Sequence, residues 1–95
     1  MVFKIFLESR AKEDLIDTLS YYESKSLKVA EKFYTKVEET LDYLIYYAYA
    51  FEEKRIAKYE IPIKGFPYSV VYEIDENVIH VLSIFNTHQN PTKKP

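Results

Sequence analysis

The stretch YSVVYEIDENVIHVLSIF, residues 68–85, contains two runs of β-branched and aromatic residues around a short polar connection. The runs at 68–74 and 78–85 have the composition of β-strands. The connection DEN, residues 75–77, is typical of a tight turn, since Asn77 tolerates a positive φ angle. The stretch therefore predicts a β-hairpin. Its last run is apolar on both faces, which predicts a strand inside a sheet.

Two further strands are expected outside this hairpin. Residues 55–63, RIAKYEIPI, alternate roughly between polar and apolar side chains and reach Pro62, which predicts a strand. Residues 64–67, KGFP, include the only glycine of the chain and form the expected turn to the hairpin. The short apolar run VFKIFL, residues 2–7, predicts a strand near the start of the chain.

The segment between the expected strands at residues 2–7 and 55–63 has a helical period. Apolar residues recur every three or four positions on two stripes: Ala11, Leu15, Leu19 and Tyr22, then Ala30, Phe33, Val37, Leu41, Leu44 and Ala48. We expect one helix over residues 9–23 with Ser9 as its N-cap, and a second over residues 26–47 with Ser26 as its N-cap. Two amphipathic helices joined by a few residues form an antiparallel hairpin, and a sheet must cover their stripes.

The order of these elements predicts an α+β fold. An N-terminal strand, a helical hairpin and a three-stranded antiparallel meander follow one another, with the helices packed on one face of a four-stranded sheet. Residues 1–95 have the length of a single domain with one modest core. The chain contains no cysteine and no apolar run of the roughly 20 residues that cross a membrane. We therefore expect a cytoplasmic protein without disulfides or membrane contact.

The charge distribution limits the partners that the sequence predicts. With a formal net charge of −2, the chain has no general attraction for nucleic acid. Residues 54–64 differ from the rest, because four basic residues there face Glu60 alone, which gives a local charge of +3. These four are Lys54, Arg55, Lys58 and Lys64. We expect any anion-binding site to lie there or near Lys93 and Lys94.

Several kinds of chemical site are excluded by what the chain lacks. A single glycine leaves no Gly-rich phosphate-binding loop. His80 and His88 are the only histidines, and they lack the spacing of a zinc site. The serines are not placed in a nucleophile elbow. We therefore expect neither a cofactor nor a metal ion.

Residues 11–44 and 54–91 carry a set of marks in a characteristic order. These marks are Ala11, the EDL at 13–15, Tyr22, Ala30 with Phe33, Arg55, and FPYSVVYEID at 66–75. In this combination the chain resembles the RelE/ParE toxin superfamily of type II toxin–antitoxin systems, which includes plasmid stabilisation proteins. The fold of that superfamily agrees with the order of elements expected from periodicity. The resemblance implies a cytoplasmic toxin that inhibits growth and is neutralised by a cognate antitoxin protein.

The resemblance also implies one of two activities. One branch of the superfamily cleaves mRNA in the ribosomal A site, and the other poisons DNA gyrase. Metal-independent RNA cleavage needs a base, cations around the phosphate and an acid. For that branch the resemblance implies a tentative catalytic set of His88, Arg55 and Asn86. The candidates for binding phosphate or another part of the target are Lys54, Lys58 and Lys64.

Two departures from the superfamily pattern weigh against RNA cleavage. Many members carry histidine directly after the last strand, where this chain has Asn86, and arginine within that strand, where it has Ser83. An amide orients other groups but transfers no proton. We therefore expect a toxin that binds and inhibits a target such as DNA gyrase. A ribosome-dependent mRNA endoribonuclease is one alternative, and an inert domain that only binds its antitoxin is another.

Structural roles compete with functional ones for several of these residues. Arg55 pairs with a nearby carboxylate in one interpretation, and Lys58 is then an exposed strand charge. His80 is expected on the same strand face as Leu82 and Ile84, where it is a core histidine with a hydrogen-bond partner. These interpretations stand beside the catalytic ones.

The aromatic and apolar residues predict packing and a partner surface. Phe66, Tyr68 and Tyr72 share one strand face and are expected to pack in the sheet, with stacking on nucleic-acid bases as the alternative. A domain of 95 residues cannot cover all of its apolar surface. We therefore expect an exposed apolar groove that a segment of the antitoxin fills.

Overall fold

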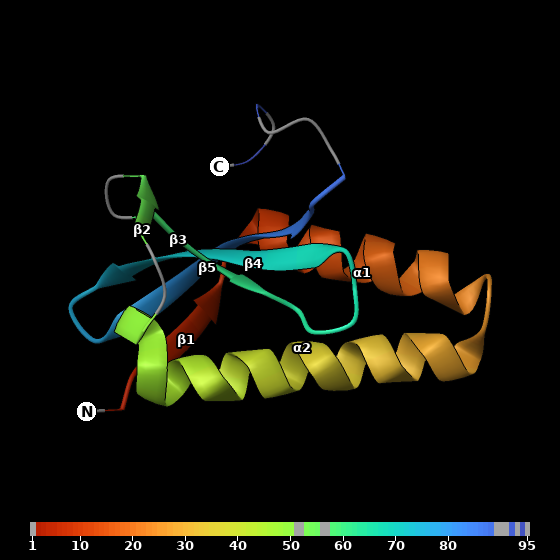
Figure 1. Cartoon of the computed structure of the whole chain (residues 1–95), viewed down its shortest axis with the longest axis horizontal. Helices are drawn as coiled ribbons and strands as arrows, with labels where there is room; N and C mark the ends of the chain where they lie inside the picture. The colour runs from red at the N-terminus through yellow and green to blue at the C-terminus, as the bar shows by residue number, and fades with distance from the viewer. Residues whose placement is uncertain (1, 51–52, 56–57, 89–91, 93, 95) are drawn as a thin grey trace.

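The computed structural model describes residues 2–50, 53–55, 58–88, 92 and 94, with the backbone alone at residues 50 and 53–55. Figure 1 shows a sheet with a long helical hairpin packed against it. In chain order the elements are β1 (Lys4–Leu7), α1 (Ser9–Glu23), α2 (Leu27–Tyr47), the 3₁₀ turn η1 (Ala48–Ala50), β2 (Glu53–Arg55), β3 (Lys58–Pro62), β4 (Tyr68–Asp75) and β5 (Val78–Asn86).

The strands of the described residues form one sheet in the order β1-β5-β4-β3-β2. β1 runs parallel to β5, and all other neighbours are antiparallel. The expected meander is formed by β3, β4 and β5, and β5 lies inside the sheet, as its two apolar faces predict. The α+β class is confirmed, but the sheet is one strand wider than expected. The predicted strand 55–63 contributes Arg55 to the edge strand β2 and residues 58–62 to β3, while residues 56–57 lie outside the described part.

The two helices begin for different reasons. The Ser26 side chain accepts a hydrogen bond from the Val29 backbone N–H at 3.3 Å, which confirms the expected N-cap of α2. The expected N-cap at Ser9 is wrong, because Ser9 is already the first helical residue and Glu8 occupies the N-cap position. The Glu8 backbone N–H donates to the Val81 carbonyl at 2.9 Å. The β1–β5 pairing therefore holds Glu8 extended, and α1 begins directly after it, one residue earlier than an N-cap at Ser9 would place it.

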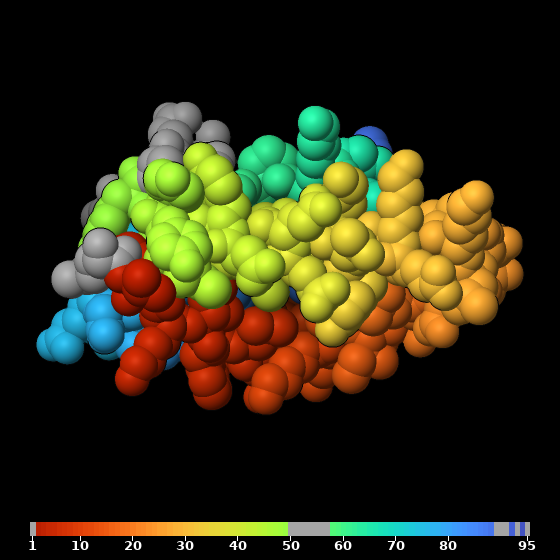
Figure 2. Space-filling view, turned by 90° about the horizontal axis from the view of Figure 1, so that it is seen from below, coloured from red at the N-terminus to blue at the C-terminus, as the bar shows by residue number. Residues whose placement is uncertain are grey.

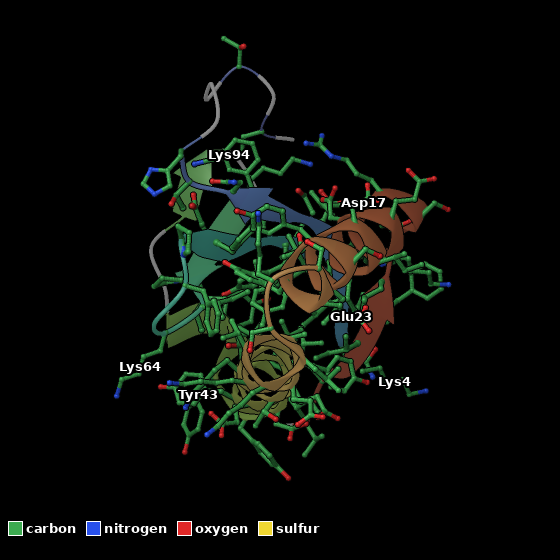
Figure 3. All side chains as sticks on the ribbon, turned by 90° about the vertical axis from the view of Figure 1, so that its right-hand side faces the viewer. Lys4, Asp17, Glu23, Tyr43, Lys64 and Lys94 are labelled. Carbon is green, nitrogen blue, oxygen red and sulfur yellow. The ribbon has the colours of Figure 1, made fainter. Side chains whose placement is uncertain are left out.

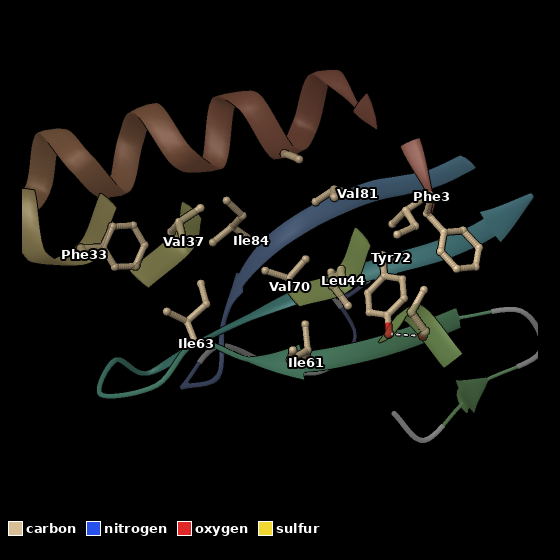
Figure 4. Packing of buried hydrophobic residues seen from close by; sticks show 13 residues of the cluster. Phe3, Phe33, Val37, Leu44, Ile61, Ile63, Val70, Tyr72, Val81 and Ile84 are labelled. Carbon is tan, nitrogen blue, oxygen red and sulfur yellow. Dashed lines mark hydrogen bonds between the residues drawn. The ribbon is translucent and has the colours of Figure 1, made fainter. Parts of the chain in front are cut away.

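The core lies between the helical hairpin and the sheet (Figure 4). α2 contributes Phe33, Val37 and Leu44, which are spaced by four and seven residues and are at most 1% exposed. In Figure 2, α2 (yellow to green) runs along one face of the molecule, with α1 (orange) beside it. The apolar stripe of α2 is therefore buried, while its opposite side forms much of that face.

Aromatic side chains join the helices to the sheet, as expected for Phe66, Tyr68 and Tyr72. The Phe33 ring centroid lies 5.0 Å from that of Phe66 and 5.4 Å from that of Tyr68, both in edge-to-face geometry. Tyr72 is fully buried, and its hydroxyl donates to the Ala48 carbonyl at 2.7 Å. The predicted packing of these aromatic residues in the sheet is confirmed.

A β-bulge in β5 changes which side chains face the helices. Val71 pairs with Ser83, whereas the next residue of β4 pairs with Val81, so Leu82 is an extra residue. The core positions of β5 are consequently spaced by two residues before the bulge and by three across it. The expected common face for His80, Leu82 and Ile84 is therefore wrong. Ile84 packs in the core, while His80 is half-buried.

The partner of His80 and the turn residue of the β4–β5 hairpin also differ from expectation. His80 Nδ1 lies 3.1 Å from Glu8 Oε1, so the expected partner of this histidine exists, but at the β1 side of the sheet. In the β4–β5 turn the positive φ angle, 54°, belongs to Glu76 and not to Asn77. Gly65, in the turn before β4, also has a positive φ angle of 86°, which a glycine adopts without strain.

Candidate functional site

The sheet face away from the helices carries the polar groups of the middle strands. Tyr59 and Ile61 of β3 pack against the core, so the alternation of a strand turns Lys58 and Glu60 to the opposite face. Phe85 of β5 is 3% exposed, although it does not belong to the core cluster on the helix side. This helix-free face is therefore partly covered by other parts of the chain.

The C-terminal segment provides part of that cover. Lys94 Nζ lies 2.8 Å from Glu60 Oε1 and 5.3 Å from the centre of the Phe85 ring. Figure 3 shows Lys94 on the side of the molecule away from Tyr43 of α2. The Lys94 side chain therefore lies on the helix-free face, where it contacts β3 and β5.

The basic side chains described on this face are paired with carboxylates. Lys58 Nζ lies 2.8 Å from Glu73 Oε2 on the neighbouring strand, and Lys94 Nζ bonds Glu60 at the same distance. Each ammonium group therefore has a hydrogen-bonded anion as its neighbour. A phosphate group would have to compete with these carboxylates for the positive charge.

The residues directly after β5 form a local turn. Asn86, the last residue of β5, pairs with Tyr68, and its side-chain oxygen accepts a hydrogen bond from the His88 backbone N–H at 2.9 Å. Such a side-chain bond to the backbone two residues later closes an Asx turn. The Thr87 backbone N–H donates to the Pro67 carbonyl at 2.9 Å. Asn86 thus ends the strand, and the His88 side chain is exposed.

The sheet register separates the predicted catalytic residues along the strands. Arg55 pairs with Lys58, whose side chain contacts Glu73, and Glu73 pairs with His80. The backbone of Arg55 therefore lies at the level of His80, near the start of β5, and not at the level of Asn86. From there β5 continues to Asn86, a rise of about 20 Å at roughly 3.3 Å per residue, before His88 follows.

The remaining predicted ligands lie at different ends of β3. Lys58 begins this strand, and Lys64 lies exposed beyond its end in the turn to β4. The backbones of Lys54 and Arg55 belong to β2, while their side chains lie outside the described part. The structure brings Asn86 and His88 together through the turn, and it does not gather the lysines with them. The catalytic and ligand roles of all six stay predictions.

Sequence analysis missed a polar connection between α1 and the bulge of β5. Asp14 Oδ2 accepts hydrogen bonds from Ser83 Oγ at 2.8 Å and from the Ile84 backbone N–H at 3.0 Å. The Arg10 Nε atom lies 3.9 Å from the same oxygen. Ser83 was noticed only as a departure from a family pattern. Its position opposite Asp14 depends on the bulge, for which the sequence offers no signal.

Two hollows lie on the surface of the described part. One, of about 220 Å³, lies between α1 and the end of β5, and Asp14, Thr18 and Asn86 are among its lining residues. The other, of about 320 Å³, lies between the facing ends of α1 and α2. Its lining residues are Leu19, Glu23, Leu27, Ala30, Glu31, Tyr34 and Thr35. The second hollow has the apolar character expected of a partner groove.

The outer side of α2 carries a group of exposed tyrosines. Tyr43 and Tyr47 stack with ring centroids 4.7 Å apart, and Tyr46 lies 6.4 Å from Tyr47. All three side chains are between 44% and 62% exposed. Amphipathic rings of this kind are enriched at protein interfaces.

The protonation state of one tyrosine follows from its burial. Burial raises the pKa of the Tyr72 hydroxyl well above its ordinary value, and the neighbouring Tyr59 adds to the effect. The hydroxyl is therefore protonated at neutral pH and acts as the donor to the Ala48 carbonyl. Its role is structural.

Within the ranges that the structure describes, no three histidine or carboxylate side chains are grouped so as to hold a metal ion. None of the helices in these ranges combines the length and the apolar character needed to cross a membrane.

The chain is similar to known proteins over most of its length. The family model described as "ParE toxin of type II toxin-antitoxin system, parDE" matches residues 5–91. A solved structure titled "Chromosomal ParDE TA system from P. aeruginosa" superposes with a TM-score of 0.80 over 92% of this chain and 98% of that one, at 15% identity. At this identity the structural likeness concerns the fold alone. No curated protein sequence matches the chain.

Proposed function

The chain belongs to the family of ParE toxins of type II toxin–antitoxin systems, and we propose that it acts by binding and inhibiting a target such as DNA gyrase. Gyrase is proposed because one branch of the RelE/ParE superfamily poisons this enzyme. In this proposal the toxin acts in the cytoplasm and cleaves no RNA. Its effect depends on the surface it presents and not on a reacting group.

The observation that carries this proposal is the pairing of Lys58 and Lys94 with carboxylates on the helix-free face. A metal-independent ribonuclease stabilises the charge that grows on the phosphate with unopposed cations. On this face Lys58 bonds Glu73 and Lys94 bonds Glu60, each at 2.8 Å. The described cations are thus already matched by carboxylates, which supports target binding over phosphate chemistry.

The positions of the proton-transfer candidates support the same proposal. The residue directly after the apolar part of β5 is Asn86, which transfers no proton and whose oxygen accepts a bond from the His88 backbone N–H. His88 itself is exposed and follows the end of β5. Arg55 pairs with Lys58 at the start of β3, away from the end of β5. General acid–base catalysis requires such groups within about 3 Å of one reacting site.

We also propose that a cognate antitoxin covers the hollow between the ends of α1 and α2. Its wall contains Leu27, which is 62% exposed, and Tyr34, which is 45% exposed. An amphipathic segment that lays apolar side chains into such a groove removes both from water. Each buried residue of this size stabilises a complex by roughly 1–2 kcal/mol before the cost of association.

The test compares two reactions with the same preparation of purified toxin. We expect the toxin to inhibit supercoiling by gyrase in a concentration-dependent manner, and addition of the antitoxin to restore the reaction. A defined mRNA on translating ribosomes should show no new cuts when primer extension is used to detect cleavage. Cuts in the A-site codon would overturn the proposal in favour of the ribonuclease, and failure of both reactions together with absent growth arrest would leave an inert antitoxin-binding domain.

A further inference from the structure

The hollow between α1 and the end of β5 has the features of a binding pocket of its own. It lies at the α1–β5 contact, whereas the proposed antitoxin groove lies between the ends of the two helices. Its volume of about 220 Å³ is below the roughly 300–1,000 Å³ of pockets for drug-sized ligands. A single long side chain matches this size better than a nucleotide does. We call it the α1–β5 pocket.

One carboxylate of the α1–β5 pocket is held in place by the fold. Asp14 Oδ2 receives hydrogen bonds from Ser83 Oγ and from the Ile84 backbone N–H, at 2.8 and 3.0 Å. Both donors belong to β5, so the carboxylate cannot turn away without breaking the contact of α1 with the sheet. Such preorganisation lowers the ordering cost when a ligand binds.

A second observation points into the same pocket. Thr18 is 7% exposed and lines the cavity. No hydrogen bond of its hydroxyl is found among the residues that the structure describes, and no fully enclosed polar side-chain atom in that part lacks a partner. The hydroxyl therefore reaches the open space of the pocket. A hydroxyl placed in this way can form a hydrogen bond with a ligand in the pocket.

The charges and rings of the pocket select the ligand. Two carboxylates, Asp14 and Asp17, line the pocket with one guanidinium, that of Arg10, so the lining has a formal charge of −1. The other polar residues of the lining include Tyr68 and Asn86. Carboxylate and hydroxyl oxygens accept the several N–H donors of a guanidinium, and a tyrosine ring stacks on its plane. An anion would face a net negative wall.

We propose that the α1–β5 pocket binds an arginine side chain of a protein partner, with Asp17 and Thr18 as the groups that receive the guanidinium. This inference rests on the proposed function, in which the toxin acts through contacts with other proteins. Asp14 is the positioning residue that fixes the wall, since its inner oxygen is already engaged by β5. In Figure 3, Asp17 lies on α1, on the side of the molecule away from Tyr43 of α2.

The test uses Nα-acetyl-arginine amide as the probe and the full chain as the receptor. In ¹H–¹⁵N spectra we expect the backbone signals of Thr18, Ile84 and Asn86 to shift on titration, with a Kd on the order of 1 mM for so small a ligand. Nα-acetyl-citrulline amide has nearly the same shape without the charge and should produce no saturable shift. Equal shifts with both probes, or none with arginine at about tenfold higher concentration, would overturn the proposal.

Two variants and one matched control locate the site. Asp17→Asn removes an exposed carboxylate and should raise the Kd about tenfold, while Thr18→Val keeps the side-chain shape and should raise it about three- to fivefold. Asp42→Asn removes an exposed carboxylate of α2, outside the pocket, and should leave the Kd unchanged. If Asp17→Asn and Asp42→Asn behave alike, the attraction is general and the pocket is not the site.

The outcome is separable from that of the proposed function. Probe binding requires neither gyrase nor antitoxin, so it can succeed when supercoiling is unaffected, and the reverse is equally observable. If wild-type toxin inhibits gyrase but fails to bind the probe, only the pocket assignment is wrong. If it binds the probe but does not inhibit gyrase, the proposed target is wrong and the assignment of the pocket is supported.

Discussion

Single side chains in this toxin act chiefly by joining elements that are distant in sequence. Tyr72 ties the centre of the sheet to the end of α2 through its bond to the Ala48 carbonyl. Asp14 ties α1 to β5 through two bonds on one oxygen. The Tyr72 hydroxyl lies in the apolar core, where a satisfied hydrogen bond is worth more than the same bond in water.

Replacing Tyr72 by phenylalanine should lower the free energy of unfolding by about 1–2 kcal/mol at neutral pH, since it leaves the buried Ala48 carbonyl without its donor. The difference between the two proteins should shrink as the pH rises. The folded-state pKa of Tyr72 is raised, so its contribution is fully present below the unfolded-state value of 10.0 and declines above it. Urea unfolding curves at pH 8 to 11 measure this difference.

Above the unfolded-state pKa, the wild type should lose its advantage over Tyr72→Phe at about 1.4 kcal/mol per pH unit. The other tyrosines and the lysines ionise in both proteins, so the difference between the curves isolates Tyr72. Tyr46→Phe is the control, because this ring is 62% exposed. A constant difference between wild type and Tyr72→Phe from pH 8 to 11 would contradict the assigned pKa shift.

At the scale of elements, caps and bulges decide where helices begin and which side chains a strand presents. α2 begins where Ser26 caps it, while α1 begins where the β1–β5 pairing releases the chain after Glu8. At the bulge residue Leu82, the alternation of side chains between the two faces of β5 shifts by one residue. Two helices of the same hairpin therefore start for different reasons, one local and one tertiary.

The two N-termini provide a matched pair of substitutions. Ser26→Ala should reduce the free energy of unfolding by about 1 kcal/mol, because the Val29 backbone N–H loses its side-chain acceptor. Ser9→Ala should change it by less than about 0.5 kcal/mol, because Ser9 is exposed and lies within the first turn rather than at the cap. Thermal and urea unfolding measure both values. Equal losses at the two positions would show that both serines act as caps.

Leu27, at the start of α2, should affect the partner and not the fold. Leu27→Glu places a charge in the hollow between the helix ends, where the antitoxin is proposed to bury apolar side chains. We expect the antitoxin to bind this variant at least about tenfold more weakly, measured by calorimetry, with little change in melting temperature. Ile16→Glu, at an equally exposed position of α1 outside the hollow, is the control. Unchanged antitoxin affinity of Leu27→Glu would exclude this groove.

The whole molecule has two differently built faces. The helix side is covered by the hairpin (Figure 2). Exposed tyrosines lie along α2 on this side. The helix-free side is partly covered by Lys94 and holds the paired charges of β3, β4 and Lys94. A toxin of this construction offers surfaces for partners on both sides. In the proposed function, the toxin acts through this assembled surface.

Growth arrest in bacteria tests this conclusion without a purified target. If the toxin acts by binding, expression of Arg55→Ala/His88→Ala should arrest growth as wild type does. Were the toxin a ribonuclease with these residues in the active site, each change alone should slow cleavage by about 10²-fold or more. Growth curves after induction, with protein levels matched by immunoblotting, distinguish the two. Loss of arrest in the double variant at wild-type protein level would return the catalytic assignment to these residues.

Local pattern was sufficient to predict most of this fold. The helical stripes, the strand runs at 68–74 and 78–85 and the Ser26 cap all depend on neighbours a few residues apart, and all appear in the structure. The aromatic packing of Tyr68 and Tyr72 also followed, because the side of β4 on which they lie is set by the alternation of the strand. The family marks occur within the same segments.

Only the tertiary structure decided which side chains meet. The Lys58–Glu73 pair joins residues 15 apart and the Ser83–Asp14 bond joins residues 69 apart. Each depends on the register between elements, and the bulge at Leu82 shifts that register by one residue. Register is a property of two elements together, settled by packing and hydrogen bonding over the whole sheet. The sequence could therefore identify Lys58 as a candidate ligand and Ser83 as a departure from the family pattern, but could not show that each contacts a carboxylate of another element.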